Sequence, residues 1–364
     1  MNEEPLAIAV AASKRSRYYQ PLVLDDDETA LLEALSGSAT PAMDACRGLA
    51  RALAARSMLH LGEGNREAAW NDILALHRLA RLVGQGPLMV EALLGFAIDG
   101  MATSAGIQLL QHAEPMADQA RHMEADMRAL PPLPSMAEVT NVGERFLCLS
   151  GATDLARGIG DGGPLGRVAD PKVASEVDWD LALRFCNAWY DGLVDRARIP
   201  SYSKRREAFE EFDKKFEADM KQMSDRAKSP AYILRGLLGG LDQRKELGRA
   251  VGGILIATFL PSTGQARLVE DRQSMTFDIT RVAIALAGYK AEHGEYPDTL
   301  DALAPKYIPE VPLDRYTDKP LVYKKTDDGY LLYALGPNLK DDGGTSLDDD
   351  RVNYDIVVRM PARE

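Results

Sequence analysis

The side chains that most clearly have the makings of a chemical site are aspartates near the end of the chain. Six lie between Asn338 and residue 355, opposed by Lys340 and Arg351: Asp341, Asp342, Asp348, Asp349, Asp350 and Asp355. A calcium ion takes about six to eight oxygen ligands, several of them carboxylates. Gly343 and Gly344 would let the backbone turn around an ion. The segment is not an EF-hand. If Asn338 is counted as its first position, Lys340 falls where an oxygen ligand belongs. The pattern predicts a calcium-binding loop or, alternatively, a solvated acidic turn.

Two short motifs match chemical signatures only formally. Gly158, Gly160 and Gly163 fit G-x-G-x-x-G, but a helical pattern precedes them where a dinucleotide-binding loop needs a strand. A flexible linker is the favoured interpretation. Ser201 and Lys204 fit the S-x-x-K of penicillin-binding enzymes. Companion motifs are missing and a charged helix follows, which favours a helix cap.

Glu91 and Asp99 lie eight residues apart in an apolar helical segment, and therefore on one helix face. Paired carboxylates can act as acid and base. Hydrogen bonds to arginines or to the ends of neighbouring helices are the favoured interpretation. The histidines do not fall in H-E-x-x-H spacing. The sequence therefore predicts a protein that is not an enzyme, and an enzyme using Glu91 and Asp99 is the least favoured alternative.

The overall charge argues against several partners. The chain has 364 residues, with 43 Lys and Arg against 55 Asp and Glu, for a net charge of -12. This balance repels phosphate backbones and anionic lipids, so nucleic acid is not an expected partner. Cys46, Cys148 and Cys186 are distant from one another and odd in number, which argues against a disulfide framework or a zinc site.

The sequence as given predicts no membrane span. The most apolar stretch, Leu88–Leu110, contains Glu91 and Asp99, and a spanning helix needs about 20 apolar residues. The apolar run Leu6–Ala12 is short and follows two glutamates, unlike a signal peptide. The question of a membrane anchor upstream of Met1 stays open.

The elements that would position these residues fall into three predicted segments. Residues 1–24 are poorly patterned, residues 25–260 form an α-helical domain, and residues 261–364 form an α+β domain. In the helical part, Thr40 and Pro41 predict a helix start, and the segment from Gly62 to Asn65 predicts a break between two helices. A charged helix over residues 204–226 carries one apolar stripe, predicted to be core or a helix contact: Phe209, Phe212, Phe216, Met220 and Met223.

The α+β domain reads as one long helix packed on a small antiparallel sheet. Apolar residues recur at helical spacing from Leu268 to Tyr289 and the pattern stops at Gly294. Strands are predicted over residues 321–325, 330–335 and 353–359, with a tight turn at residues 327–329. A fragment from about Arg267 is expected to fold alone if the helix and sheet close their own core.

Several motifs of this domain resemble the globular head of the major, G-type pseudopilin of type II secretion systems. Residues 285–297 resemble the segment in which the long helix ends in a Gly-x-Tyr-Pro turn. Residues 312–314 and 319–323 resemble its proline, aspartate and strand-entry motifs, although Lys319 departs from the usual glycine. Residues 329–336 resemble the strand that ends in Tyr-Ser-Leu-Gly. The order and spacing of these motifs cover about residues 254–356.

The resemblance implies a pilin-like head and a calcium site. Carried over residue by residue, the implied ligands are Leu335 (through its carbonyl), Asn338, Asp348, Asn353 and Asp355, with Asp350 as a replacement for Asp348. A pseudopilin begins with a processing site and a spanning helix, whereas residues 1–253 stand in that place here. This N-terminal region resembles helical domains of uncharacterised bacterial envelope proteins, which implies no activity.

Together these features predict a non-catalytic envelope or secretion-associated protein whose head is ordered by calcium. Its expected partners are other envelope or secretion proteins. Its expected location is the cell envelope, either periplasmic or anchored and facing outward. The alternative is a cytoplasmic helical scaffold that binds partners through the Phe209–Met223 stripe.

Overall fold

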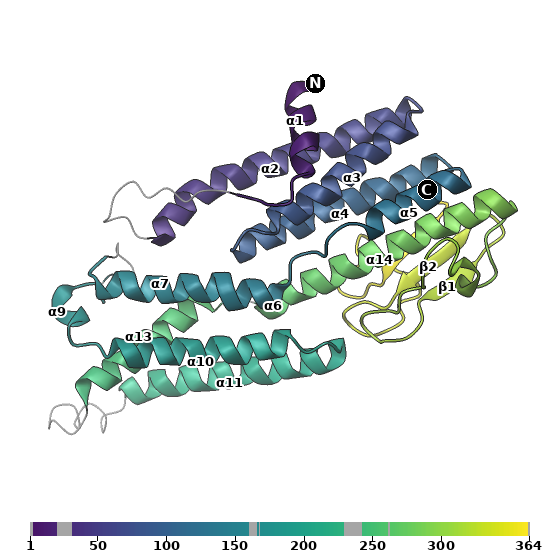
Figure 1. The fold of residues 1–364 in the computed structure, drawn as a ribbon. Helices are drawn as coiled ribbons and strands as arrows, with labels where there is room; N and C mark the ends of the chain where they lie inside the picture. The colour runs from purple at the N-terminus through teal and green to yellow at the C-terminus, as the bar shows by residue number, and fades with distance from the viewer. Residues whose placement is uncertain are drawn as a thin grey trace.

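The structure is a computed structural model that describes residues 3–19, 31–159, 166, 168–228, 242–260 and 263–362. In this part helices dominate, and one three-stranded antiparallel sheet lies near the C-terminus (Figure 1). The coarse prediction, helices followed by an α+β segment, is confirmed. The helices are α1 (Glu3–Ser13), α2 (Leu31–Gly62), α3 (Arg66–Val83), α4 (Met89–His112), α5 (Ala117–Arg128), α6 (Met136–Val139), the π-helix η1 (Thr140–Glu144), α7 (Arg145–Ala156), α9 (Pro171–Ala174), α10 (Trp179–Ala197), α11 (Tyr202–Lys228), α13 (Gln243–Phe259), α14 (Thr263–His293) and the 3-10 turn η2 (Leu300–Leu303).

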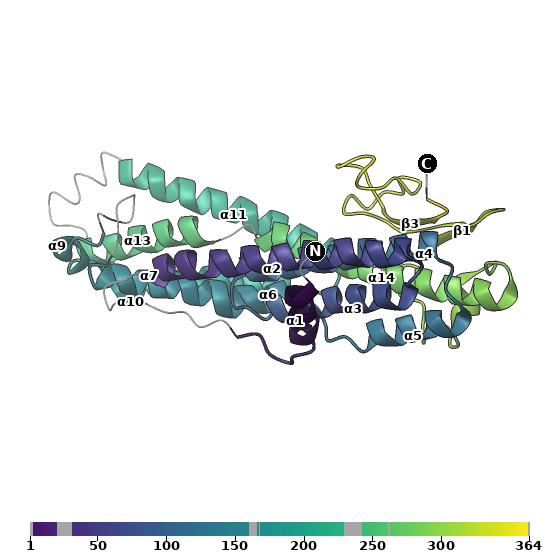
Figure 2. The same cartoon turned by 90° about the horizontal axis from the view of Figure 1, so that it is seen from above.

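The molecule is elongated, and most helices run along its length (Figures 1 and 2). Helices α7, α10, α11 and α13 gather at one end around their own hydrophobic core. Helices α1 to α4 form a second core beside it. Helix α14 lies along α4 and α5 and carries the sheet on its other side.

The apolar stripe of α11 lies inside the first of these cores. Phe209 and Phe212 are buried, and Trp189 of α10 meets the rings of Phe212 and Phe216 edge to face at 5.3 and 5.2 Å. Met220 packs against the same core. The prediction of a core or helix-contact stripe is confirmed. The alternative of a scaffold that binds partners through this face stays a prediction, and α10 already covers Phe212 and Phe216 of the stripe.

One local prediction near the N-terminus is wrong, and one helix there was not predicted. Residues 1–24, predicted to be poorly patterned, include helix α1, which buries Leu6, Ala9 and Ser13 against α2 and α3. Their spacing of three and four residues is one helix face, too short to stand out. Helix α2 does not start at Pro41 but runs through it from Leu31. Proline lacks the N–H that would bond the preceding turn, so α2 gives up one hydrogen bond there and continues.

Helix α4 occupies the centre of the helical part. It is, within the described residues, the one helix long and apolar enough to cross a membrane. In the structure it packs against α2, α3 and α14, and 61% of its most apolar window is buried. Core helices of soluble proteins pass the same test of length and composition. The prediction of a buried helix over Leu88–Leu110 is confirmed.

The C-terminal elements follow the sequence prediction closely. Strands β1 (Val322–Lys325), β2 (Tyr330–Ala334) and β3 (Ile356–Met360) pair antiparallel in the order β1-β2-β3. The β1–β2 hairpin closes where Thr326 N–H donates to the carbonyl of Gly329 at 3.0 Å. Helix α14 ends at His293, and Gly294 follows with a φ of 82°. This left-handed conformation is why glycine stands there.

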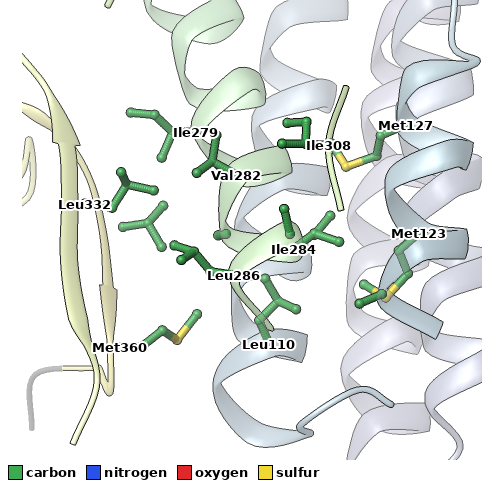
Figure 3. Packing of buried hydrophobic residues seen from close by; sticks show 14 of the residues in the cluster. Leu110, Met123, Met127, Ile279, Val282, Ile284, Leu286, Ile308, Leu332 and Met360 are labelled. Carbon is green, nitrogen blue, oxygen red and sulfur yellow. The ribbon is translucent and has the colours of Figure 1, made fainter. Parts of the chain in front are cut away.

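The sheet and the helical part share one hydrophobic core through α14. Figure 3 shows Ile279, Val282 and Leu286 on the side of the sheet, and Ile284 on the side of Met123 in α5. All belong to a single buried cluster that reaches from Trp70 in α3 to Met360 in β3. The predicted boundary between residues 260 and 261 stays a prediction, but the core continues across it.

Candidate functional site

The acidic loop, residues 335–355, joins β2 to β3. Its first residue is held by Asp314, which is 2% exposed. Asp314 Oδ2 accepts hydrogen bonds from the Leu335 N–H at 3.0 Å and the Thr317 hydroxyl at 2.9 Å. Its Oδ1 accepts from the Tyr316 N–H at 2.8 Å. Asp314 thus fixes the end of β2, a role that its place in a sequence motif did not reveal.

The middle of the acidic loop is tied to the sheet by Asp341. Its Oδ1 accepts from the Tyr333 hydroxyl and from the Gly343 N–H, both at 2.9 Å. These two hydrogen bonds, Gly343 first, hold the pKa of Asp341 below its usual value. The sequence analysis named Asp341 only as one of six aspartates and did not predict this role, although Asp two positions before a glycine is a known turn pattern. Gly343 and Gly344 follow with φ of 71° and 79°, as their predicted turning role requires.

Asp355, the last predicted ligand, is the last residue of the loop and is 1% exposed. Its Oδ2 accepts from the Gly344 N–H at 2.8 Å, while its Oδ1 is buried without a hydrogen-bond partner in the described structure. Burial raises the pKa of this carboxyl, backbone N–H groups of Gly344 and Asp342 lower it, and the charges of Asp342 and Asp341 raise it again. The net shift is upward. Asp355 is therefore a buried acid with an unsatisfied oxygen and two neighbouring aspartates.

The other predicted ligands make local contacts. Asn338 Oδ1 accepts from the Lys340 N–H at 2.9 Å, and its Nδ2 donates to Asp342 Oδ2 at 2.8 Å. Asp350 Oδ1 accepts from the N–H groups of Val352 and Asn353 at 2.8 and 3.1 Å. Asp348 and Asn353 are exposed. Leu335 lies at the loop entrance.

These residues do not form a ready coordination shell. Across the described ranges, no group of three or more His, Cys, Asp or Glu side chains is placed to hold a metal ion. The chemistry of the donors still suits a hard cation, because the loop offers carboxylate, amide and carbonyl oxygens. The unpaired Oδ1 of Asp355 is the atom that such an ion would satisfy.

Asp99, the second candidate carboxylate, lies in a fully buried polar cluster. Its Oδ1 is 2.6 Å from His77 Nδ1 and 2.6 Å from Arg81 Nη1, and its Oδ2 accepts from Gln273 Nε2 at 2.8 Å. Burial alone would raise the pKa of Asp99, but its partners outweigh burial and hold the pKa at about 2. The cluster joins α3, α4 and α14. The predicted interaction with an arginine is confirmed.

Glu91 serves a different purpose two turns earlier in α4. Its Oε2 accepts from the Leu88 N–H at 3.0 Å at the start of the helix, and burial raises its pKa. The carboxyl group also lies against Gly86, where an added Cβ atom would lie 2.2 Å from the carboxyl carbon. The prediction that this carboxylate bonds a helix end is confirmed. Glu91 and Asp99 have separate partners, so the geometry brings no acid–base pair together.

The formal motifs show no chemistry in the parts that the structure describes. Gly158 ends the turn after α7 with a φ of 81°, and Gly160 and Gly163 lie outside the described residues. Ser201 directly precedes α11, and its carbonyl accepts the Arg205 N–H at 3.0 Å. This placement agrees with the interpretation as a helix start.

Comparison with protein-family models, with curated proteins and with solved structures finds no match in any of the three. The resemblance to pseudopilin heads therefore rests on the sequence motifs and on the order of elements that they mark.

Proposed function

We propose that this chain is a non-catalytic protein of the cell envelope or of a secretion apparatus, and that calcium stabilises its pilin-like C-terminal part. The proposal extends to the expected partners, which are other envelope or secretion proteins. The observation that carries it is the buried Oδ1 of Asp355 at the end of the acidic loop, which has no hydrogen-bond partner among the described residues.

The order of elements supports the pilin-like part of the proposal. A helix of 31 residues is followed by a short 3-10 turn, a β-hairpin, a long acidic loop and a last strand. The motifs that carry the resemblance mark the end of α14, the entry to β1 and the end of β2. These are the same places at which the pseudopilin pattern puts them.

The electrostatics of Asp355 support the calcium part. An ionised carboxylate that loses water without gaining a full set of hydrogen bonds is unfavourable, and the charges of Asp341 and Asp342 add to the cost. A cation at Oδ1 would remove both penalties. Because no complete shell is present among the described side chains, binding would draw loop oxygens around the ion. Metal binding and loop ordering would then be one event.

Calcium should raise the melting temperature of the full chain, and Asp355 should be required. Calcium at about a hundredfold excess over its dissociation constant adds about 2.7 kcal/mol. For a chain of this size we expect a rise of roughly 5 °C, measured by scanning calorimetry with calcium and with chelator. Magnesium should give much less, because it needs a tighter octahedral shell. Asp355→Asn should remove most of the calcium effect.

Asp328→Asn is the matched control, since it removes the same charge from the exposed β1–β2 turn at the opposite end of β2. It should keep the full calcium effect. A dissociation constant of about 10⁻⁴ to 10⁻³ M would fit an extracytoplasmic module, whereas one below about 10⁻⁵ M would favour a cytoplasmic sensor. Identical melting curves in calcium and chelator would refute the calcium site. An equal loss in both variants would refute the assignment to Asp355.

A further inference from the structure

A cavity at the end of α1 has a charge opposite to that of the whole protein. The basic cavity, about 620 Å³ in volume, lies between the end of α1, the face of α3 and the end of α5. Four basic side chains line it: Lys14, Arg15, Arg78 and Arg81. Asp126 is the one acidic residue that the described part of the chain contributes to the lining, in a protein of net charge -12.

The acid in the lining is already engaged elsewhere. Asp126 Oδ2 accepts a hydrogen bond from Trp70 Nε1 at 2.9 Å and lies 3.6 Å from His122 Nε2. No carboxylate of the described residues forms an ion pair with Lys14, Arg15 or Arg78. Lys14 and Arg15 follow the C-terminal end of α1, where basic residues also complement the helix dipole. Arg78 lies in α3 before its last turn, where that explanation does not apply.

Arg81 gives the cavity a rigid, preorganised base. Its Nε donates to the Pro131 carbonyl at 2.7 Å, and its Nη1 donates to Asp99 and to the His77 carbonyl. The ring of Phe277 lies 4.8 Å from the guanidinium carbon. The residue is only 5% exposed, yet it lines the cavity. Nε and Nη1 of Arg81 are thus bonded to protein groups. The described contacts do not use the third guanidinium nitrogen, Nη2.

The wall made by the chain after α1 is also fixed. Gln85 at the end of α3 donates through Nε2 to the Ser16 carbonyl at 3.2 Å, and its Oε1 accepts from the Tyr18 N–H at 3.0 Å. These two hydrogen bonds fix the chain directly after Lys14 and Arg15, which line the same cavity as Arg78. The volume is within the range of small-molecule sites, roughly 300 to 1,000 Å³.

We propose that the basic cavity binds an anion that carries phosphate groups. Arginine forks match the geometry of phosphate oxygens, and lysine adds a point charge. Among the described residues Lys14, Arg15 and Arg78 have no acidic partner, so an anion in the cavity would supply their counter-charge. The phosphate can belong to a soluble compound or to the headgroup of a phospholipid, and the two sources differ in a direct test.

The test uses the full chain, with sodium pyrophosphate as the soluble probe in titration calorimetry. We expect binding that weakens as salt concentration rises, because exposed charges are screened. Arg78→Gln should weaken it about tenfold, the usual effect of losing one charge-assisted hydrogen bond. The double variant Lys14→Gln with Arg15→Gln, on the exposed segment after α1, should do the same if Arg78→Gln disturbs folding.

Arg184→Gln is the matched control, because Arg184 is an exposed base on α10, a helix of a different hydrophobic core from that of α1. It should leave affinity unchanged. In a second arm, vesicles of phosphatidylcholine are compared with an equal mixture of phosphatidylcholine and phosphatidylglycerol. Binding to the mixed vesicles alone, sensitive to Arg78→Gln, assigns the site to a lipid headgroup. Binding to neither probe, or equal weakening by Arg78→Gln and Arg184→Gln, overturns the proposal.

Discussion

Asp99 joins α3, α4 and α14 through one carboxylate. Its partners His77, Arg81 and Gln273 come from positions 22, 18 and 174 residues away in the chain. Phe277 packs its ring edge to face with His77 at 5.5 Å and so closes the cluster on the α14 side. A buried charge needs such a complete set of partners, and breaking one pair leaves another charge uncompensated.

Asp99→Asn should therefore destabilise the protein in a way that depends on pH. Because the pKa of Asp99 is lowered from 3.8 to about 2 in the folded state, its ionised form stabilises the fold at neutral pH. This contribution, about 2 kcal/mol, is present above the unfolded-state pKa and is lost as pH falls from about 4 to 2. Urea unfolding of both proteins measures it, with the larger difference at about pH 7.

Asp180→Asn is the control, since Asp180 pairs with Arg184 on the exposed face of α10 and such pairs contribute little. The free-energy difference for Asp99→Asn should shrink at about pH 3, whereas that for Asp180→Asn should stay small throughout. A difference for Asp99→Asn that is the same at both pH values would show that the charge of Asp99 is not the source of the stabilisation.

For single residues, the sequence predicted the kind of interaction better than the particular partner. The sequence placed Glu91 and Asp99 on one helix face and expected an arginine or a helix end as partner, and both expectations hold. Gln273 was not predicted as a partner, because its contact with Asp99 depends on how α14 crosses α4. The unpaired oxygen of Asp355 is likewise a result of packing, which spacing does not encode.

Close backbone contacts between elements depend on single glycines. Gly143 lies in η1 against the loop before α4, and a Cβ atom there would lie 1.6 Å from the Pro87 carbonyl oxygen. Gly48 lies on the exposed side of α2, with nothing within 4 Å of such an atom. The two positions are both helical, so they separate packing from helix propensity.

Gly143→Ala should destabilise the chain strongly, while Gly48→Ala should stabilise it. At Gly143 the backbone of Pro87 must move, which we expect to cost about 1 to 3 kcal/mol. At Gly48 alanine improves helix propensity by about 1 kcal/mol at no steric cost. Thermal unfolding of the two variants measures both signs. Two stabilised variants would show that the contact between η1 and the loop before α4 is not as close as described.

Elements with strong local signals were predicted well, and those decided by packing were not. The β1–β2 hairpin follows from an Asp-Gly turn between apolar strands, and the end of α14 follows from Gly294. The start of α2 at Leu31 was missed because Thr40 and Pro41 are typical of a helix start, whereas the helix continues through both residues. Helix α1 was missed because its buried face has three residues, which a periodicity of this length does not resolve.

Across the whole molecule, α14 is the element that makes one core out of two predicted domains. One side of it faces the sheet and the other faces α4 and α5 (Figure 3). An ion pair reinforces the second side, where Arg281 Nη2 lies 2.5 Å from Glu124 of α5. Another joins α14 to α11, where Arg205 lies 2.5 Å from Asp271. A fragment from about Arg267 would expose this side, and its independent folding stays a prediction.

Truncation of Ile284 should therefore loosen the sheet and the helical part together. Ile284 is fully buried on the α5 side of α14, and Ile284→Ala should cost about 2 to 5 kcal/mol. Hydrogen exchange should speed up both in β2 and β3 and in α4 and α5, because the shared core opens as one unit. Amides of α10, which belongs to another core, should change less. Ile8→Ala, at a position that is 62% exposed in α1, is the matched control and should change little. If Ile284→Ala instead opens α4 and α5 while β2 and β3 keep their protection, the C-terminal part is an independent domain and the predicted boundary at residue 260 is the true one.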